Sequence, residues 1–466
     1  MSPPKPNACR VLVPSGVLGS GCPQAAFDRG LSLAPHVIAV DAGSTDSGPY
    51  YLGAGVTRMT RKAVKRDLRQ LMIGRAQLGI PLLIGSCGTS GTDAGVDWLA
   101  EICAEIAAEE GQSVKVALIY SEQDPERLAG YLARGAISPL PPVPPLTAER
   151  LRECDHIVGL MGYEPFAAAI ENGADIVLAG RTTDTAVLAA VPLMRGLPPG
   201  PSWHAAKTAE CGGLCTTRAR QGGVMLSIDA GGFDVEPLHA DNSCTPYSVS
   251  AHMLYENSDP YQLREPGVLL NAKAAVYTAI DARTVRVTGS AHQVMPYTIK
   301  LEGSGGIGFR TMVFSAIADP KILADLDRFL ERLKDHVVTG ITSVLGYAPG
   351  EYDFDIRPYG SHALAQPGAQ ERKAVPQEVG LMALATAPTQ EMATEIAKFS
   401  TPMLLHFPLN ADDPMPSFAF PFSPAEVELG GLYEFKLNHV VAVDDPLELM
   451  RTTYFTTHQG ERRAVA

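Results

Sequence analysis

No hydrophobic run in this 466-residue chain reaches the roughly 18 apolar residues that a membrane-spanning helix requires. The first residues, MSPPKPNACRVLVPSG, also lack the charged start, apolar centre and small-residue cleavage site of a secretory signal. We therefore expect an uncleaved cytoplasmic protein that does not act at a membrane.

Positive charge is scarce as well. The chain has 38 Lys and Arg residues against 51 Asp and Glu residues, which gives a net charge of −13. Nucleic-acid-binding proteins usually present a basic patch to the phosphate backbone, so we expect no nucleic-acid partner. An anionic substrate would have to be held by local hydrogen-bond donors, because the overall field of the protein repels it.

Several nucleotide-binding and hydrolase signatures are missing. The sequence has no G-x-x-x-x-G-K-[ST] motif, which argues against a Walker-type nucleotide site, and no G-x-S-x-G nucleophile elbow. The segment GVLGSG at 16–21 differs from the G-x-G-x-x-G pattern of dinucleotide-binding folds. The chain therefore offers no motif for a nicotinamide cofactor or for ATP.

The eight cysteines form no recognisable disulfide or metal-binding pattern. Cys211 and Cys215 are four positions apart, but no second pair follows at the spacing of a structural zinc site, and no H-E-x-x-H motif occurs. We therefore expect reduced thiols and assign no residue as a metal ligand, although Asp41 and Asp46 could hold a metal as an alternative to acting as a general base. The cofactor stays unknown, with a divalent metal ion as an open alternative.

Strand and helix patterns alternate over residues 1–204. Helical spacing of apolar residues predicts helices at 62–78 and 94–110, the second after a capping box at 90–93. Six nearly continuous apolar runs predict buried parallel strands at 10–14, 37–41, 81–85, 114–120, 156–160 and 175–179. Such units are typical of an α/β domain with an open, mostly parallel, doubly wound sheet.

Beyond residue 204 the pattern changes to α+β. Two strand–helix–strand units, at 310–356 and 378–406, predict split β-α-β-like units, the last strand lying at 403–406. We therefore expect two domains, 1–204 and 205–466, the second of which contributes to the cleft of the first.

The predicted strands of the first domain end in loops that are rich in glycine, serine, threonine and aspartate. Ligands of doubly wound sheets bind outside the carboxyl ends of the strands. Glycine lets backbone N–H groups approach a ligand closely, and helix N-termini favour a carboxylate or phosphate. We therefore expect a small-anion pocket formed by loops 14–21, 41–48, 85–93, 161–165 and 179–184.

Four side chains are candidates for catalysis: Asp41, Asp46, Cys87 and Glu210. An aspartate could act as a general base or could cap a helix or turn. A thiol near helix N-termini would have a lowered pKa, whereas a buried cysteine more often fills apolar space. The candidates for substrate binding are Ser44, Thr45, Ser86, Thr89, Ser90, Thr92, Arg181, Thr182, Asp184 and His252.

Two of the binding candidates have specific alternatives. Arg181 follows a predicted buried strand, where its guanidinium could clamp a substrate carboxylate or pair with a neighbouring aspartate. His252 and Glu256 are four positions apart, so on a helix they would share a face. That arrangement suits an acid–base pair or two metal ligands, and a structural, hydrogen-bonded histidine is the alternative.

Six ordered segments, spread over nearly the whole chain, carry a family pattern. They are DAGSTDSGPYYLG (41–53), GSCGTSGTDAG (85–95), AGRTTDTA (179–186), SAHMLYENSDPYQLREPG (250–267), YTIKLEGSGGIGFRT (297–311) and YEFKLNHVVAVDDPLE (433–448). Together they resemble the acyclic terpene utilisation family, whose founding members accompany citronellol and geraniol breakdown through CoA thioesters of branched unsaturated acids. The resemblance implies an enzyme that acts on an acyl-CoA or a small carboxylic acid. It supplies no catalytic residues to transfer.

The leading hypothesis is a hydro-lyase or isomerase that acts on an unsaturated carboxylate or its CoA thioester by general acid–base catalysis. The alternatives are a non-catalytic subunit that binds an acyl ligand and a metal-dependent hydrolase or ligase. Some relatives carry a small extra C-terminal domain or are encoded beside a separate small protein. Because this chain stops soon after 433–448, the resemblance implies a small partner subunit, and we also expect a homo-oligomer.

Overall fold

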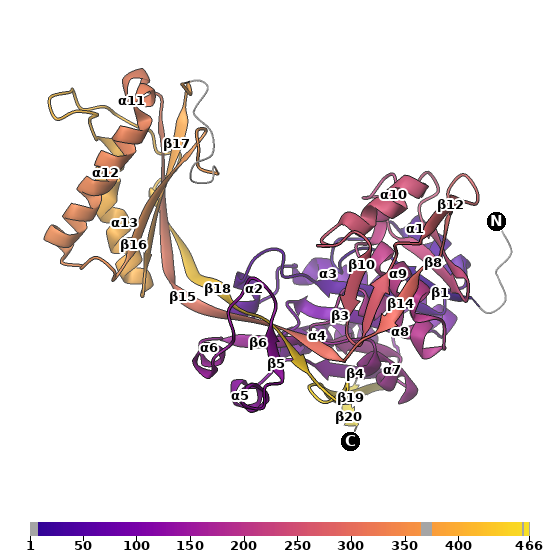
Figure 1. Cartoon of the computed structure of the whole chain (residues 1–466). Helices are drawn as coiled ribbons and strands as arrows, with labels where there is room; N and C mark the ends of the chain where they lie inside the picture. Colours follow the sequence, from indigo (N-terminus) through magenta and orange to yellow (C-terminus); the bar gives the residue numbers. More distant parts are fainter. Residues whose placement is uncertain (1–7, 365–374, 459–460, 466) are drawn as a thin grey trace. The chain divides into compact units, whose positions relative to one another are not determined.

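The computed structural model describes residues 8–364, 375–458 and 461–465 (Figure 1). Residues 1–7 lie outside these described ranges. They belong to the N-terminal stretch in which we expected no cleavable leader. The chain forms two compact units, Met1–Gly305 with Phe435–Ala466, and Gly306–Glu434. This division differs from the boundary expected at residue 204, because strands from 224–288 join the same sheet as the first strands of the chain. Every helix in the described ranges is too short or too polar to span a membrane.

An eleven-stranded mixed sheet forms the centre of the larger unit. Its middle consists of parallel strands in the order β1 (Cys9–Val13), β2 (Val37–Gly43), β3 (Leu82–Thr89), β7 (Ile176–Ala179) and β4 (Lys115–Tyr120). Each is almost completely buried, as the continuous apolar runs of their sequences predict. Five of the six expected parallel strands are therefore present, within a larger mixed sheet.

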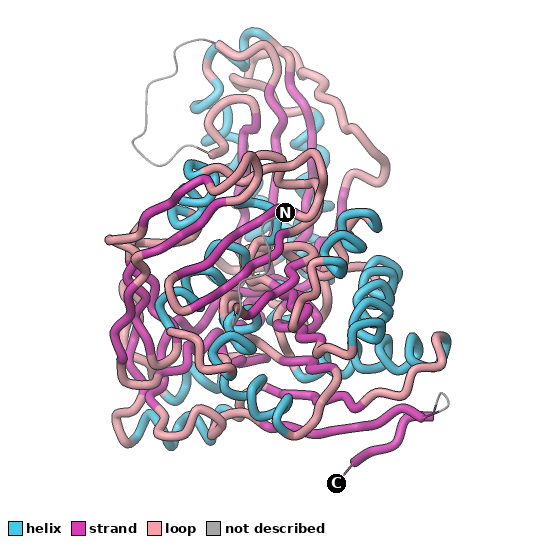
Figure 2. The backbone as a smooth tube through the Cα atoms, turned by 90° about the vertical axis from the view of Figure 1, so that its right-hand side faces the viewer, coloured by secondary structure: helices cyan, strands magenta, loops and turns pink. Residues whose placement is uncertain are grey.

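Antiparallel strands extend this sheet on both sides. Beside β1 lie β8 (Val224–Asp229), β9 (Gly232–Pro237), β13 (Val285–Thr288) and β12 (Val276–Ala279). Beside β4 lies the hairpin of β19 (Arg451–His458) and β20 (Glu461–Val465), visible next to the C-terminus in Figure 2. A separate three-stranded sheet contains β10 (Gln262–Glu265), β11 (Val268–Asn271) and β14 (Ala291–Val294).

The sixth predicted strand forms as β6 (His156–Leu160), but the prediction that it joins the parallel sheet is wrong. It pairs antiparallel with β15 (Thr298–Ile317), so that Leu160 lies opposite Lys300 and His156 lies opposite Ser304. A continuous apolar run indicates burial, but it does not identify the partner strand or its direction. In the same unit β5 (Ile137–Pro139) pairs with the end of β18 (Glu426–Ala442).

Helices cover both faces of the parallel strands. Val11, Ala39 and Leu83 belong to the core shared with α8 (Ala186–Met194) and α9 (Pro199–Ala209). Their neighbours in sequence belong to the core shared with α3 (Arg61–Leu78) and α4 (Asp93–Glu109), as the alternation of side chains along a strand requires. The remaining helices are α1 (Gln24–Ser32), α2 (Tyr50–Gly53), α5 (Pro125–Ala133), α6 (Ala148–Arg152), α7 (Glu164–Glu171), α10 (Pro246–Ala251), and the 3₁₀ turns η1 (Gly212–Cys215) and η2 (His252–Leu254).

The N-cap of α4 lies two residues after Ser90, with which the predicted capping box begins. Thr92 is the N-cap, and its hydroxyl accepts a hydrogen bond from the Gly95 N–H at 3.2 Å. The hydroxyl of Ser90 instead donates to the Tyr51 carbonyl at 3.3 Å. The capping box that begins at Ser90 is therefore wrong, because a tertiary contact holds that side chain.

The smaller unit has its own sheet and core. Along the chain come β15, α11 (Pro320–Ala324), α12 (Leu326–Gly340), the π-helical turn η3 (Ile341–Leu345), β16 (Asp353–Tyr359), β17 (Val379–Ala387), α13 (Gln390–Leu405) and β18. The sheet order within it is β16-β17-β15-β18, and α12 and α13 pack on one face (Figure 1). The predicted strand at 403–406 is wrong: Met403–Leu405 ends α13, since so short an apolar run does not distinguish a helix end from a strand.

Candidate active site

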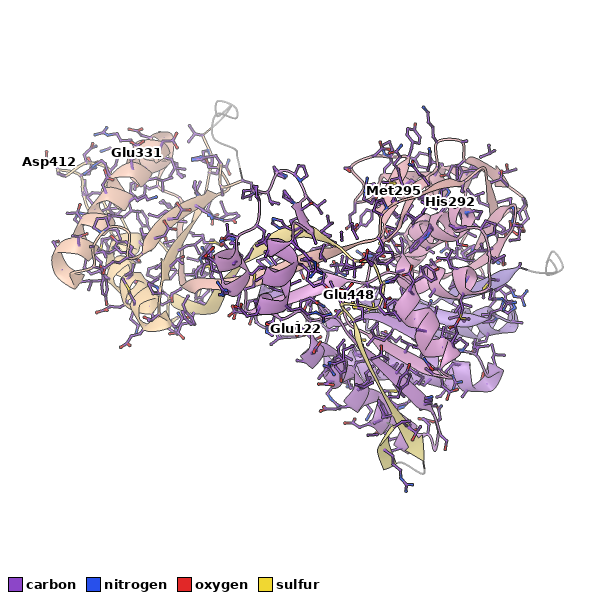
Figure 3. All side chains as sticks on the ribbon, turned by 60° about the horizontal axis from the view of Figure 1, so that its bottom comes forward. Glu122, His292, Met295, Glu331, Asp412 and Glu448 are labelled. Atoms are coloured by element: carbon purple, nitrogen blue, oxygen red, sulfur yellow. The ribbon has the colours of Figure 1, made fainter. Side chains whose placement is uncertain are left out.

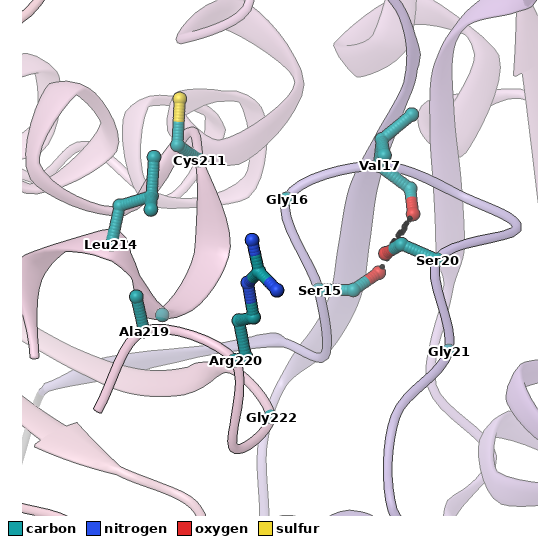
Figure 4. A pocket seen from close by; sticks show the side chains of 11 residues that line it. Ser15, Gly16, Val17, Ser20, Gly21, Cys211, Leu214, Ala219, Arg220 and Gly222 are labelled. Carbon is teal, nitrogen blue, oxygen red and sulfur yellow. Dashed lines mark hydrogen bonds between the residues drawn. The ribbon is translucent and has the colours of Figure 1, made fainter.

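Two adjoining pockets lie at the carboxyl ends of the central strands, both within the larger unit. The acidic pocket, about 210 Å³ in volume, is lined by five carboxylate residues and by polar and glycine residues of the strand-end loops: Asp41, Gly43, Ser44, Asp46, Thr89, Asp184, Glu210 and Glu256 among them. The glycine-rich pocket, about 480 Å³, contains Ser15, Gly21, Leu214, Arg220 and Gly222 in its lining (Figure 4). Gly16, Val17 and Cys211 line both pockets, so the two pockets share part of their wall.

Loops that are far apart in the sequence meet in the acidic pocket. Loop 41–48 contributes Asp41, Ser44 and Asp46, loop 85–93 contributes Thr89, and loop 179–184 contributes Asp184. They meet because β2, β3 and β7 are parallel neighbours, which places their carboxyl ends at one edge of the sheet. Glu210, the remaining catalytic candidate that lines this pocket, arrives from the end of α9.

The charge of the lining differs from the anion-binding pocket that we expected. The pocket has five carboxylates, and Arg58, an exposed residue, is the cationic residue of its lining. Ionised carboxylates in the lining would repel a free anion inside the pocket. The pocket therefore favours protonated carboxyl groups, a bound cation, or a ligand whose anionic part lies elsewhere.

Asp41 is the most deeply buried of these acids, with 4% of its surface exposed. Its Oδ2 accepts a hydrogen bond from the Gly43 N–H at 3.3 Å, while Oδ1 has no hydrogen-bond partner among the residues that the structure describes. Burial, reinforced by the charge of Asp184, raises the pKa of Asp41 to about 7, although Arg181 opposes the shift. This carboxyl group can therefore hold or release a proton near neutral pH.

Arg181 does not clamp a ligand carboxylate in this structure. Its Nε donates to Glu302 Oε2 at 3.1 Å, and its Nη1 donates to Ser86 Oγ at 3.1 Å and to Asp184 Oδ1 at 3.3 Å. The side chain is 6% exposed and absent from both pocket linings. The alternative reading, an ion pair with a neighbouring aspartate, is the one observed, and Arg181 orients Asp184 at the pocket wall.

A second buried cation lies behind Glu210. The Lys207 ammonium donates to Glu210 Oε1, and the two side chains are 4% and 5% exposed. Burial nevertheless raises the pKa of Glu210 well above its usual range. Burial also raises the pKa of Glu265, to about 7, although the hydroxyls of Thr183 and Thr185 oppose the shift. Within the described part of the chain, Glu265 Oε2 has no hydrogen-bond partner.

Cys87 was a catalytic candidate on the expectation of a lowered thiol pKa, and that expectation is wrong. The residue is completely buried, lines neither pocket, and directs its thiol to the Ile84 carbonyl at 3.8 Å. Burial and the nearby Asp41 raise its thiol pKa well above the usual value. Cys87 therefore fills core space on the α4 side of the sheet.

His252 and Glu256 do not share a helix face. The 3₁₀ turn that starts at His252 ends at Leu254, and Glu256 has the unusual backbone φ of 55°. Glu256 lies in the acidic pocket, where burial and the neighbouring Asp46 raise its pKa. His252 lies behind the pocket wall, and its ring stacks on Tyr255 with centroids 5.6 Å apart.

The other binding candidates stabilise the loops rather than line the pockets. Ser86 and Ser90 bond to Arg181 and to the Tyr51 carbonyl, and Thr92 caps α4. Thr182 is buried, and its hydroxyl has no hydrogen-bond partner in the described ranges. The backbone carbonyl of Thr45 accepts a hydrogen bond from the Gly48 N–H.

The glycine loop 14–21 binds the carboxylate of Asp67, a side chain of the protein itself. The Gly19 and Gly21 N–H groups donate to Asp67 Oδ2 at 2.9 and 2.8 Å. These amides are therefore not available to a ligand. The cation at this pocket is Arg220, whose side chain extends into the space between Ser15–Ser20 and Cys211 (Figure 4).

The loop after β4 is held by Glu122, which Figure 3 labels. One of its carboxylate oxygens accepts the Asp93 N–H at 2.9 Å, and the other lies 2.5 Å from His156 Nδ1. Asp93 in turn pairs with Arg451 at 3.0 Å. These contacts fix the start of α4 and thereby the position of loop 85–93.

Sequence patterns gave no indication of Lys207 or Glu302 and only an indirect one of Glu265. Lys207 lies on a helix without a motif, and Glu302 lies on a strand more than a hundred residues from its partner Arg181. Glu265 belongs to the cluster of polar residues at 252–267, which was a visible signal. Their roles depend on tertiary packing, which spacing along the chain does not encode.

Residues 73–195 and 229–413 match the family described as "Acyclic terpene utilisation family protein AtuA". The chain matches no curated protein and no solved structure. The family match confirms the resemblance drawn from the six sequence segments. Because the matched stretches make up more than half of the chain, the protein belongs to the acyclic terpene utilisation family.

Proposed function

We propose that this protein is an enzyme that acts on a small unsaturated carboxylic acid or its CoA thioester, by hydration, dehydration or isomerisation. The observation that carries the proposal is Asp41: a buried carboxyl group that lines a pocket and whose pKa is raised to about 7. A general acid–base catalyst works best when its pKa lies near the operating pH. Family membership supports a substrate of this class, because the family is named for the use of acyclic terpenes.

In this proposal the two pockets have different tasks. The acidic pocket receives the unsaturated carbon atoms. In isomerisation Asp41 takes a proton from one carbon and returns it to another. In hydration the oxygen of a water molecule bonds to one carbon of the double bond while a proton of that water passes through Asp41 to the other carbon, and dehydration is the reverse. Arg58 and Arg220 lie at the outer parts of the linings, where they would hold the carboxylate or the phosphates of CoA. This separation keeps the negative charge of the substrate away from Asp184 and Glu210.

We further propose that the reaction takes place in the cytoplasm. None of the eight cysteines, all of which lie in the described ranges, forms a disulfide. Reduced cysteines are typical of a reducing compartment.

Replacing Asp41 by Asn should reduce turnover by at least about a hundredfold while the protein stays folded, because the amide keeps the shape but cannot transfer the proton. Candidate substrates come from a thermal-shift panel of short unsaturated carboxylates and CoA thioesters, in which a ligand at about 100 times its dissociation constant adds about 2.7 kcal/mol of stability. Turnover of each stabilising compound is then followed by NMR.

Asp175→Asn is the matched control, since Asp175 lies just before β7 and pairs with Arg75, away from both pocket linings. It should retain activity. Full activity of Asp41→Asn would contradict the assignment. Tight binding without any turnover by the wild-type protein would instead favour a ligand-binding subunit.

A further inference from the structure

Three side chains of different chemical types meet at Cys211, which lines both pockets. A carboxylate oxygen of Glu210, the Cys211 sulfur and a ring nitrogen of His252 all lie within 4.8 Å of one another. Glu210 and Cys211 follow helix α9, and His252 begins the turn η2. The cluster therefore joins two segments that are about forty positions apart in the sequence.

One ring nitrogen of the histidine in this cluster lacks a hydrogen-bond partner among the described residues. His252 is 5% exposed, and its Nε2 is buried without a hydrogen-bond partner among the described residues. A buried polar atom without a partner costs roughly 1–3 kcal/mol, and such atoms are rare in folded proteins. A bound ligand at this position would remove that cost.

We infer that Glu210, Cys211 and His252 bind a divalent transition-metal ion of the zinc type. Sulfur, imidazole nitrogen and carboxylate oxygen are the ligands that zinc prefers in proteins. Three protein ligands leave a fourth position for water or substrate, as in catalytic zinc sites. Cys211 lines both pockets, so the open position would face the space that a ligand occupies.

The charge around the cluster favours a cation. Asp41, Asp46, Asp184 and Glu256 line the acidic pocket together with Glu210. Lys207 neutralises part of this charge through Glu210 Oε1, which leaves Oε2 of the same carboxylate for a metal ion. The lining as a whole still has more carboxylates than cationic groups, so a divalent ion lowers the electrostatic energy of the pocket.

The geometry requires only a small adjustment. In a tetrahedral zinc site the ligand atoms are roughly 3.5 Å apart, given bonds of about 2.0–2.3 Å to the ion. The three atoms here have to close from at most 4.8 Å. The closure required is about 1 Å between ligand atoms, and Cys211 lines the open space of both pockets.

Cobalt substitution tests the site directly, because Co²⁺ bound by a thiolate has a charge-transfer absorption band in the near ultraviolet and intense visible bands when tetrahedral. The full chain is stripped with a chelator and titrated with Co²⁺ and, by calorimetry, with Zn²⁺. We expect one ion per chain and a thiolate charge-transfer band. Cys211→Ser should remove that band, and His252→Gln and Glu210→Gln should each weaken Zn²⁺ binding by at least about tenfold.

Cys22→Ser is the matched cysteine control and should leave the band unchanged, since Cys22 lies outside the cluster. Circular dichroism verifies that each variant folds. If Cys211→Ser does not fold, Zn²⁺ binding by the folded His252→Gln and Glu210→Gln variants tests the site instead. Wild-type protein that binds no ion, or a band that persists in folded Cys211→Ser, would overturn the proposal. The readout is separate from the proposed reaction, because Asp41→Asn should lose turnover and keep the cobalt spectrum.

Discussion

Asp41 in β2 and Cys87 in β3 are both almost completely buried, at 4% and 0% exposure. Burial raises the pKa of both side chains, because the charged form loses its hydration. The consequences differ. A carboxyl group that faces a pocket and titrates near pH 7 can exchange protons with a ligand, whereas a thiol with a raised pKa stays protonated and unreactive.

The raised pKa of Asp41 makes stability depend on pH in a defined direction. The folded-state pKa of about 7 lies above the unfolded value of about 3.9, so the folded protein binds the proton more tightly between these values. The contribution of Asp41 to the free energy of unfolding therefore falls as the pH rises from about 4 to about 7. Asp41→Asn removes the effect, and its stability relative to wild type should rise by on the order of 2 kcal/mol from about pH 5 to about pH 8. Urea unfolding at both pH values measures this difference, and a constant difference would refute the assigned pKa.

Cys87→Ala should leave turnover unchanged and cost about 1 kcal/mol in stability, because the substitution removes a buried sulfur but no catalytic group. A substrate assay and urea unfolding measure the two effects. Native alkylation followed by mass spectrometry should leave Cys87 of the wild-type protein unmodified. Loss of turnover in a stable Cys87→Ala variant would restore the catalytic role that the sequence suggested.

The loop between β3 and α4 packs on the residues that follow β7. Gly91 has a φ of +71°, and a Cβ atom at this position would lie 2.2 Å from the Arg181 backbone nitrogen. This close approach fixes Thr89 and Asp184 on the same pocket wall. The glycines of loop 85–93 thus serve the contact between loops more than direct contact with a ligand.

Gly91→Ala should destabilise the protein by more than about 3 kcal/mol, because it combines a left-handed φ with a backbone clash. Gly111→Ala is the matched control: its φ of +62° is similar, but nothing lies within 4 Å of the added Cβ, so we expect a cost of about 1 kcal/mol. Denaturant unfolding compares the two variants. Equal costs would show that conformational strain alone, and not the packing of the loops, is responsible.

Elements with a strong local signal could be predicted from the sequence, and their partners could not. The helices 62–78 and 94–110 match α3 and α4 within one residue, since their apolar spacing and caps are local properties. The strand 156–160 forms, but its partner β15 lies about 140 residues away, and no local feature identifies it. The same limit applies to the site: the strand ends identified Asp41, Thr89 and Asp184, whereas the ion pairs of Arg181 and Lys207 depend on packing.

At the scale of the whole molecule, the smaller unit is an insertion between Gly305 and Phe435 of the larger one. The two crossing strands, β15 and β18, are neighbours in one sheet. The unit has its own core around Phe329, Leu333 and Leu381. Both pockets are built from residues of the larger unit alone.

A chain in which a short Gly-Ser linker replaces 306–434 should therefore fold and keep the metal-binding and ligand-binding properties of the larger unit. Circular dichroism, cobalt titration and the thermal-shift panel test this expectation. An insoluble or unfolded product would show that the larger unit needs the insertion for its stability.

Proton exchange with solvent tests the central claim most directly, namely that Asp41 transfers protons in the acidic pocket. The wild-type protein is incubated in D₂O with the unsaturated carboxylate or CoA thioester that stabilises it best, and deuterium in the carbon chain is followed by NMR. We predict incorporation by wild type and by Asp175→Asn, and a rate at least about a hundredfold lower for Asp41→Asn. Equal incorporation by folded Asp41→Asn and wild type would contradict the account.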